Sequence, residues 1–420
     1  MKGAFHMENP KKFAEVAMFP GNPHWEDAVK RENDLYSRGS KEIRSEFARD
    51  YTRVLHSNGY SRLKHKTQVF YNAAGNDHIC TRIEHVAHVE SVSSTIARAL
   101  GLNTELTRAI ATAHDIGHAP FGHQGEAVLK ALTRKYLGYE IWHERNGVHF
   151  VDDIELLLDP QDFRQNLNLT YAVRDGIISH CGEVDHNCLR PREEYFDIMN
   201  EFQTPGQYNA VTWEGCVVKL ADKIAYIGRD IEDADLLGYF TEKEKKILKD
   251  IAARCNENAV NTTVVTHSMI ADVCINSSPE KGLCFSPEMH EILTEIKDFN
   301  YKKIYKNKRL KYYQDYSKLI LESLFHYLKR CYKGKKTFET LEKEGMLHPF
   351  VKLFAEWLAL YVHPNESYPD KINRLSDSAK NKKIYGNLET RTVYYQAVID
   401  FIAGMTDKYA QSAFEELLRC

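Results

Sequence analysis

Residues 110–126 constrain the fold and the chemistry of this chain more than any other stretch. They carry an adjacent His114–Asp115 pair at the end of a small-residue run with a helical pattern, and further imidazoles and a carboxylate follow within a dozen positions. Imidazole and carboxylate are the ligands of a hard or borderline divalent metal, and histidine is the commonest acid–base side chain near neutral pH. On a regular helix His114 and Asp115 point about 100° apart. They can share one metal only where the helix ends, and Gly117 and Pro120 supply that break.

Two further metal ligands are available from other helical segments. His85 lies in one such segment, and Asp222 interrupts an otherwise apolar helical run, where burying a carboxylate is costly unless it is paired or metal-bound. Alone, His85 is more often a core or surface histidine, and Asp222 can pair with a neighbouring lysine. Together they predict one metal site built from His85, His114, Asp115 and Asp222. No cysteine joins the set, so a thiolate-preferring metal is disfavoured, and Mn²⁺, Mg²⁺, Fe²⁺, Co²⁺ and Ni²⁺ all stay open.

The rest of the chain predicts a mainly α-helical fold. Hydrophobic content of 43% and charged content of 27% are typical of a globular protein, and a net charge of -3 provides no global field for nucleic acid. Thr104 is the expected N-cap of one helix and Gly101 the C-cap of the helix before it. Only 260–265 favours a strand. The segments with helical pattern are 41–55, 82–100, 104–113, 125–138, 147–158, 169–180, 213–236, 241–254, 287–298, 312–332, 338–361 and 387–418.

We expect three parts in the chain: a lead-in over 1–40, a core over 41–240 that carries the predicted metal ligands, and a C-terminal helical region over 241–420. No apolar run of about 18 residues occurs, so no membrane partner is expected. The first residues lack the apolar stretch of a signal peptide. Nine scattered cysteines without CxxC spacing predict reduced thiols in a cytoplasmic protein.

The sequence resembles the HD-domain superfamily, whose metal ligands are written H…HD…D. Within it, the chain is similar to the deoxynucleoside triphosphate triphosphohydrolases, the dGTPase-like family. The likeness rests on 62–70, on 82–85, on the string His-Asp-Ile-Gly-His-Ala-Pro-Phe-Gly-His-Gln-Gly-Glu at 114–126, and on 221–226, and it covers roughly 41–235. It implies an all-α fold, an HD-domain helical core with additional C-terminal helices. In this family 41–240 would be the catalytic core, and 241–420 would complete the site and make oligomer contacts. It also implies a divalent metal ion and cleavage of a deoxynucleoside triphosphate (dNTP) into a deoxynucleoside and inorganic triphosphate.

The same resemblance implies roles for side chains beyond the metal ligands. His123 would be the catalytic imidazole, Glu126 the carboxylate that orients it, and His143 a further active-site histidine. Without the resemblance, a helix-capping pair at His123 and Glu126 is the better interpretation, and His143 is nearly as often a surface residue. The substrate contacts that the resemblance implies are Gln68, Arg82, His118, Lys223, Tyr226 and Asp230.

Two other functions stay open. One is an HD phosphohydrolase that acts on a nucleoside monophosphate, cyclic nucleotide or alarmone, although simpler HD hydrolases lack the 117–126 extension. The other is a non-catalytic nucleotide sensor or nucleic-acid-binding module that uses the basic and aromatic run at 301–313. Such a run is more often a solvated helix face. The expected partners are a dNTP substrate, a nucleotide effector and further copies of the chain, because members of this family are often homo-oligomers.

Overall fold

A computed structural model describes residues 11–33, 41–71, 78–159, 161–181, 187–255 and 262–419, and the fold is mainly helical, as predicted. Before residue 240 the helices are α1 (Trp25–Val29), α2 (Glu46–His56), α3 (Asn58–Arg62), η1 (Leu63–His65), α4 (Arg82–Leu100), α5 (Thr104–Ala113), α6 (Gly122–Tyr136), α7 (His143–His149), η2 (Phe150–Ile154), α8 (Tyr171–Ser179), α9 (Ile198–Glu201) and α10 (Trp213–Leu236). After it they are α11 (Glu242–Cys255), α12 (Thr262–Asn276), α13 (Pro287–Asn300), η3 (Tyr301–Tyr305), α14 (Arg309–Arg330), η4 (Gly334–Lys336), α15 (Thr337–Leu347), α16 (Pro349–Ala359), α17 (Asp370–Asp377), α18 (Arg391–Ala403) and α19 (Asp407–Glu416).

Local signals at the helix ends explain why α4 and α5 begin and end where they do. Thr81 and Glu84 form a capping box at the start of α4, and Gly101 ends that helix in the left-handed region at φ 85°. The side chain of Asn103 accepts hydrogen bonds from the first amides of α5. Asn103, rather than the predicted Thr104, is therefore the N-cap of α5.

Helices α4, α5, α8 and α10 form the centre of the molecule. The long α10 packs along α4 and also contacts α5 and α8, while α8 additionally contacts α5 and α7. A large cluster of buried apolar side chains extends from Phe13 to Ala413, and a smaller one gathers around Phe240 and Ile304. The predicted boundaries at residues 40 and 240 stay a prediction.

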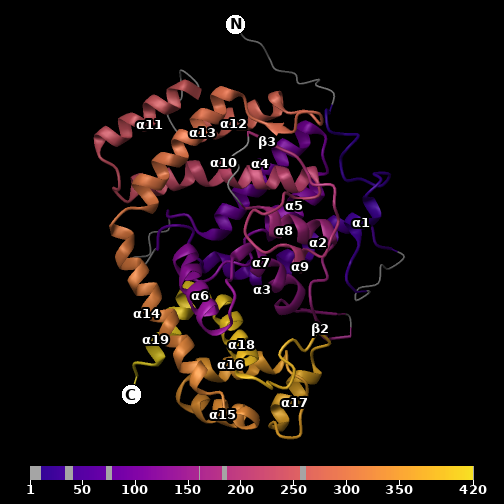
Figure 1. Cartoon of the computed structure of the whole chain (residues 1–420), viewed down its shortest axis with the longest axis vertical. Helices are drawn as coiled ribbons and strands as arrows, with labels where there is room; N and C mark the ends of the chain where they lie inside the picture. Colours follow the sequence, from indigo (N-terminus) through magenta and orange to yellow (C-terminus); the bar gives the residue numbers. More distant parts are fainter. Residues whose placement is uncertain are drawn as a thin grey trace.

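The C-terminal helices form two groups joined by α14. Figure 1 shows α11, α12 and α13 beside α10 at the top of the view, and α15, α16 and α17 at the bottom. Helix α14 runs between these groups and packs against α6, α18 and α19. No helix in the described part of the chain combines the length and apolar character needed to cross a membrane.

Four predicted elements differ in the structure. The helix predicted at 147–158 ends with η2 at Ile154, and its last two residues form strand β1 (Leu157–Leu158). The strand predicted at 260–265 is wrong where the structure describes it, because residues from Thr262 onward belong to α12. The segments 338–361 and 387–418 each contain two helices. The first is divided at His348, whose extended backbone is the conformation favoured before a proline, here Pro349.

The described residues include four short strands in two antiparallel pairs, and one pair changes the interpretation of the cysteines. β1 (Leu157–Leu158) pairs with β2 (Arg164–Gln165), and β3 (Cys188–Leu189) pairs with β4 (Leu283–Cys284). The register of the second pair places Cys188 opposite Cys284, with Cα atoms 4.4 Å apart, and the two form a disulfide. The expectation of reduced thiols is therefore wrong for this pair. A separation of 96 residues concealed it in the sequence.

Candidate metal and catalytic site

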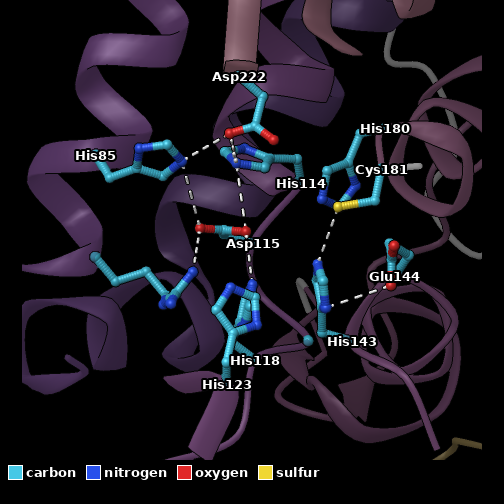
Figure 2. Close-up of polar contacts among 12 residues, drawn as sticks. His85, His114, Asp115, His118, His123, His143, Glu144, His180, Cys181 and Asp222 are labelled. Atoms are coloured by element: carbon cyan, nitrogen blue, oxygen red, sulfur yellow. Dashed lines mark hydrogen bonds and ion pairs between the residues drawn. The ribbon is translucent and has the colours of Figure 1, made fainter. Parts of the chain in front are cut away.

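Four side chains from α4, α5 and α10 meet at the centre of the helical core (Figure 2). Helix α5 ends at Ala113, so His114 and Asp115 leave the helix and both face the same point. His85 Nε2 lies 2.9 Å from Asp222 Oδ1 and 3.9 Å from Asp115 Oδ2. His114 Nε2 lies 3.4 Å from Asp115 Oδ1 and 3.9 Å from Asp222 Oδ1. The structure thus brings together all four predicted metal ligands.

The surroundings of His114 and Asp222 fit a bound cation. His114 Nδ1 donates to the carbonyl of Ala111 at 2.7 Å, which leaves Nε2 as the acceptor nitrogen. That Nε2 is buried and has no hydrogen-bond partner among the described residues. Burial raises the pKa of Asp222, but the hydrogen bond and charge of His85 outweigh this and lower it to about 2. An ionised carboxylate beside an unpartnered imidazole nitrogen is a suitable donor set for a divalent metal.

Arg82 is fully buried beside the same cluster. Its Nη1 donates to Asp115 Oδ2 at 2.7 Å, and its other nitrogens donate to the carbonyls of Thr67 and Gln68 at 3.2–3.3 Å. The guanidinium therefore holds Asp115 in place and connects α4 to the segment that carries Gln68. Arg82 also borders the cavity described below.

A second group of histidines lies next to the first. His118 Nε2 is 3.1 Å from Asp115 Oδ1, and the His118 ring stacks on the His143 ring with centroids 3.8 Å apart. Burial and the nearby positive Arg82 lower the pKa of His118 well below its usual range. Burial opposes protonation of His143 too, but Glu144 and Glu126 raise its pKa well above the usual range. Two stacked imidazoles therefore carry different charges near neutral pH.

Glu126 lies between two histidines at the start of α6. It accepts from the backbone amide of His143 at 3.0 Å, and His143 Nδ1 lies 3.2 Å from its Oε2. His123 Nδ1 lies 3.5 Å away from the same carboxylate oxygen, and the His123 side chain is 66% exposed. His143 is 8% exposed, so the alternative of a surface histidine at this position is wrong.

One cavity joins both groups of histidines to most of the predicted substrate contacts. Tyr226 and Asp230 on α10 line it together with Gln68, whereas Lys223 is buried on α10 but is not among the lining residues. The described residues that line the cavity are Gln68, Val69, Arg82, His85, Asp115, His118, His123, His143, His180, Cys181, Asp222, Tyr226, Asp230 and Tyr305.

Four residues of this cavity were not among the predicted site residues: Val69, which lies beside Gln68, and the polar residues His180, Cys181 and Tyr305. His180 and Cys181 follow directly on the last residue of α8, and Tyr305 ends η3 in the C-terminal region. The Tyr305 hydroxyl donates to the carboxylate of Asp230, whose pKa burial raises to about 6. A histidine at the end of a predicted helix, as at His114, was a signal for His180. The sequence carried no comparable signal for Tyr305.

The C-terminal region also holds the loop before α6 in shape. The buried Asp407, first residue of α19, accepts from the Phe121 amide at 2.7 Å and from the amide of Thr67 at 2.9 Å. Phe121 has a positive φ of 65°, which a bulky residue adopts only under constraint. Lys66 Nζ donates to the carbonyls of His118 and Ala403. The predicted motif segment around Lys66 therefore anchors the histidine loop to α18 and α19.

The basic and aromatic run at 301–313 contains surface lysines in ion pairs and one tyrosine that lines the cavity. Lys302 pairs with Asp298 at 3.6 Å and Lys303 with Glu244 at 2.8 Å, both partly in solvent. Tyr305 points into the cavity instead. The ion pairs fit the interpretation of this run as a solvated helix face.

Comparison with known proteins agrees with this geometry. The HD domain family matches residues 82–227, which include all four clustered side chains. A deoxyguanosinetriphosphate triphosphohydrolase-like protein of Caldanaerobacter subterraneus subsp. tengcongensis is 32% identical over 376 residues, 90% of this chain and 86% of the relative. Proteins with the same description from Desulfatibacillum aliphaticivorans and Clostridium tetani are 31% and 29% identical, over 89% and 96% of this chain and 88% and 93% of their own lengths. An HD domain implies a bound metal, and the buried His/Asp cluster is consistent with one.

Proposed function

The chain belongs to the deoxyguanosinetriphosphate triphosphohydrolase-like family of HD-domain phosphohydrolases, and from this premise we propose that it hydrolyses deoxynucleoside triphosphates to deoxynucleoside and inorganic triphosphate. The observation that carries the proposal is the buried cluster of His85, His114, Asp115 and Asp222. All of these except His114 line one cavity with His118, His123 and His143. A cation bound by these four residues would polarise a phosphoryl oxygen and activate water. The assay described below determines which dNTP and which metal the protein prefers.

The histidines and Glu126 supply the proton chemistry. Water attacks the α-phosphorus and releases one proton to solvent, while the bond from that phosphorus to the 5′-oxygen breaks. The 5′-oxygen takes a proton from His123, which solvent later replaces. Glu126 orients His123, because the carboxylate lies 3.5 Å from the ring. His143 is held cationic by Glu126 and Glu144, so it can neutralise charge on the triphosphate.

Residues on α10 and the segment before α4 face the nucleoside end of the cavity. Tyr226 offers a ring against the sugar, and Asp230 can accept a hydrogen bond from its 3′-hydroxyl group. Gln68 is buried with an amide oxygen that has no hydrogen-bond partner among the described residues, so it can accept from the substrate. Lys223 contributes positive charge next to Asp222 rather than a direct contact.

The test is an assay of the purified full chain with each dNTP and either Mn²⁺ or Mg²⁺, with products separated by chromatography. We expect deoxynucleoside plus intact triphosphate. His123→Ala should lower kcat by about 10²–10⁴-fold, the usual contribution of a general acid, and Asp115→Ala should abolish turnover. His363→Ala, at an exposed histidine away from the cavity, is the matched control and should keep full activity.

Other products would redirect the assignment. Deoxynucleoside monophosphate with pyrophosphate would leave only the metal site of the proposal in place. If single dNTPs fail, mixtures test for a dNTP effector. Failure of the mixtures as well would favour the nucleotide sensor over the enzyme.

A further inference from the structure

Cys181 brings a sulfur atom to the wall of the cavity beside two imidazoles. Its Sγ lies 3.5 Å from His143 Nε2. One ligand atom each from His143, His180 and Cys181 lie within 4.8 Å of one another. Figure 2 shows these three side chains facing one another on the side of the site away from His85. None of the four clustered His/Asp residues takes part, so this is a separate donor set.

Hydrogen bonds fix which nitrogen each imidazole offers. His180 Nδ1 lies 2.6 Å from the carbonyl of Ile177, which can only accept, so Nδ1 carries the hydrogen. His143 Nδ1 lies 3.2 Å from Glu126 and 3.3 Å from Glu144, which when ionised also only accept. Each histidine therefore has its Nδ1–H engaged, and Nε2 is the nitrogen that it can offer to a cation. In His143 this nitrogen becomes available once the cationic ring gives up its Nε2 proton. Metal-ligating histidines typically show this arrangement, with a carboxylate or carbonyl on the other ring nitrogen.

We propose that His143, His180 and Cys181 form a second cation site, which takes a thiophilic divalent ion such as Zn²⁺. Zinc binds cysteine thiolates and histidine nitrogens, and a set of three protein ligands leaves its fourth position for water or substrate. Sulfur disfavours Mg²⁺ and Mn²⁺, whereas the nearby two-His, two-Asp cluster contains no sulfur. The two sites thus differ in the metals they select.

The two sites are close enough to influence each other. The rings of His114 and His180 lie edge to face with centroids 4.9 Å apart. Binding at the second site releases the thiol proton of Cys181, and the Nε2 proton where His143 is cationic, to solvent. Burial raises the pKa of the Cys181 thiol to about 12, so the cation must displace that proton.

Occupation of the second site has a consequence for activity that rests on the proposed function. With a cation on Nε2, His143 no longer offers a proton or a hydrogen bond to the triphosphate. We therefore expect Zn²⁺ to inhibit turnover that Mn²⁺ supports, and Cys181→Ser to weaken that inhibition at least tenfold.

The binding test needs no substrate. The full chain, freed of metal by dialysis, is titrated with Co²⁺ while absorbance is followed. We expect about two equivalents to bind, one of them with a thiolate-to-cobalt charge-transfer band in the near ultraviolet. Cys181→Ser should lose the band and one equivalent, and Asp222→Asn should keep the band. Cys255→Ser is the matched control, because Cys255 is a free cysteine at the end of α11, and it should behave as the wild type.

Two results of the cobalt titration would contradict the proposed thiolate site. A wild-type protein without the band, or a Cys181→Ser protein that keeps it, shows that no thiolate site exists here. Far-UV circular dichroism of each variant separates loss of a ligand from loss of folding. A protein that shows the band but hydrolyses no dNTP would refute the proposed function alone.

Discussion

At the scale of single residues, two stacked histidines acquire opposite charge states from their surroundings. His118 is buried against Arg82, whose charge disfavours a second cation, so it stays neutral. His143 is equally buried but faces Glu126 and Glu144, so it stays protonated. One pair of rings therefore offers both a neutral nitrogen and a positive N–H to an anionic substrate, which suits the division of roles between acid and base groups.

The Tyr305 hydroxyl is expected to position Asp230 for substrate binding. Tyr305→Phe removes a hydrogen bond to a carboxylate, worth about 1.5–3 kcal/mol, so we expect KM for a dNTP to rise about tenfold with a smaller change in kcat. The measurement is steady-state kinetics of both variants. Tyr301→Phe, on the same π-helix but 53% exposed, is the control and should match the wild type. An unchanged KM in Tyr305→Phe would sink this role.

At the scale of helices, a glycine allows α7 to approach the metal motif. A Cβ atom on Gly117 would lie 2.1 Å from the carbonyl oxygen of His143 and 2.2 Å from the amide of Gly147. Asn146 also donates to the Gly117 carbonyl at 2.7 Å. The position of His143 in the cavity therefore depends on the absence of a side chain at residue 117.

Gly117→Ala should separate α7 from the histidine loop. We expect the free energy of unfolding to fall by about 3 kcal/mol, at the upper end of overpacking effects, together with loss of activity. Urea denaturation followed by circular dichroism measures the change. Gly404→Ala is the control, because a Cβ there would meet its nearest neighbour at an ordinary 3.4 Å. Equal stabilities of the two variants would contradict this account of the helix contact.

His149 joins α7 to α18 and should make stability depend on pH. Burial disfavours its charge, but Asp400 and Asp153, at 3.1 Å and 3.0 Å, raise its pKa to about 10. The folded pKa lies above the unfolded value of about 6.5. The stabilisation is therefore complete below about pH 6.5 and is lost as pH rises toward 10.

We expect His149→Gln to lower the free energy of unfolding by about 3 kcal/mol at pH 6, as breaking a buried ion pair does. The difference from wild type should shrink at pH 9. Urea denaturation at both pH values gives the comparison. His290→Gln, on α13, is the control and should show no such trend. A difference that stayed constant between the two pH values would count against a charged His149.

At the scale of the whole molecule, a metal held by α4, α5 and α10 should stabilise the fold. We expect chelation of the metal to lower Tm. Addition of Mn²⁺ at about 100 times its Kd should raise the free energy of unfolding again by about 2.7 kcal/mol. Asp222→Asn should abolish this response, while Glu366→Gln, at an exposed acid, should preserve it. Differential scanning calorimetry with and without Mn²⁺ measures both. A full Mn²⁺ response in Asp222→Asn would remove that residue from the site.

Much of the fold and the metal cluster followed from the sequence, because their signals are local. Helix periodicity and the glycine at residue 101 predicted α4, and Gly117 and Pro120 marked the end of α5 that lets His114 and Asp115 face one point. The HD-type order of ligands then predicted which distant residues join them. The segments 338–361 and 387–418 were each predicted as one helix but contain two. Where a helix is interrupted inside such a segment depends on tertiary packing.

Other features of the site and the fold could be seen only in the tertiary structure, because they depend on contacts between residues far apart in the chain. The disulfide of Cys188 with Cys284 follows from strand register, and the hydrogen bond of Tyr305 to Asp230 from the packing of η3 on α10. The burial of His143 and its pairing with Glu126 needed the first residue of α7 to lie beside Glu126 of α6. Local sequence specifies helices and their ends. The long-range packing of those helices determines which side chains share a cavity and in which charge state.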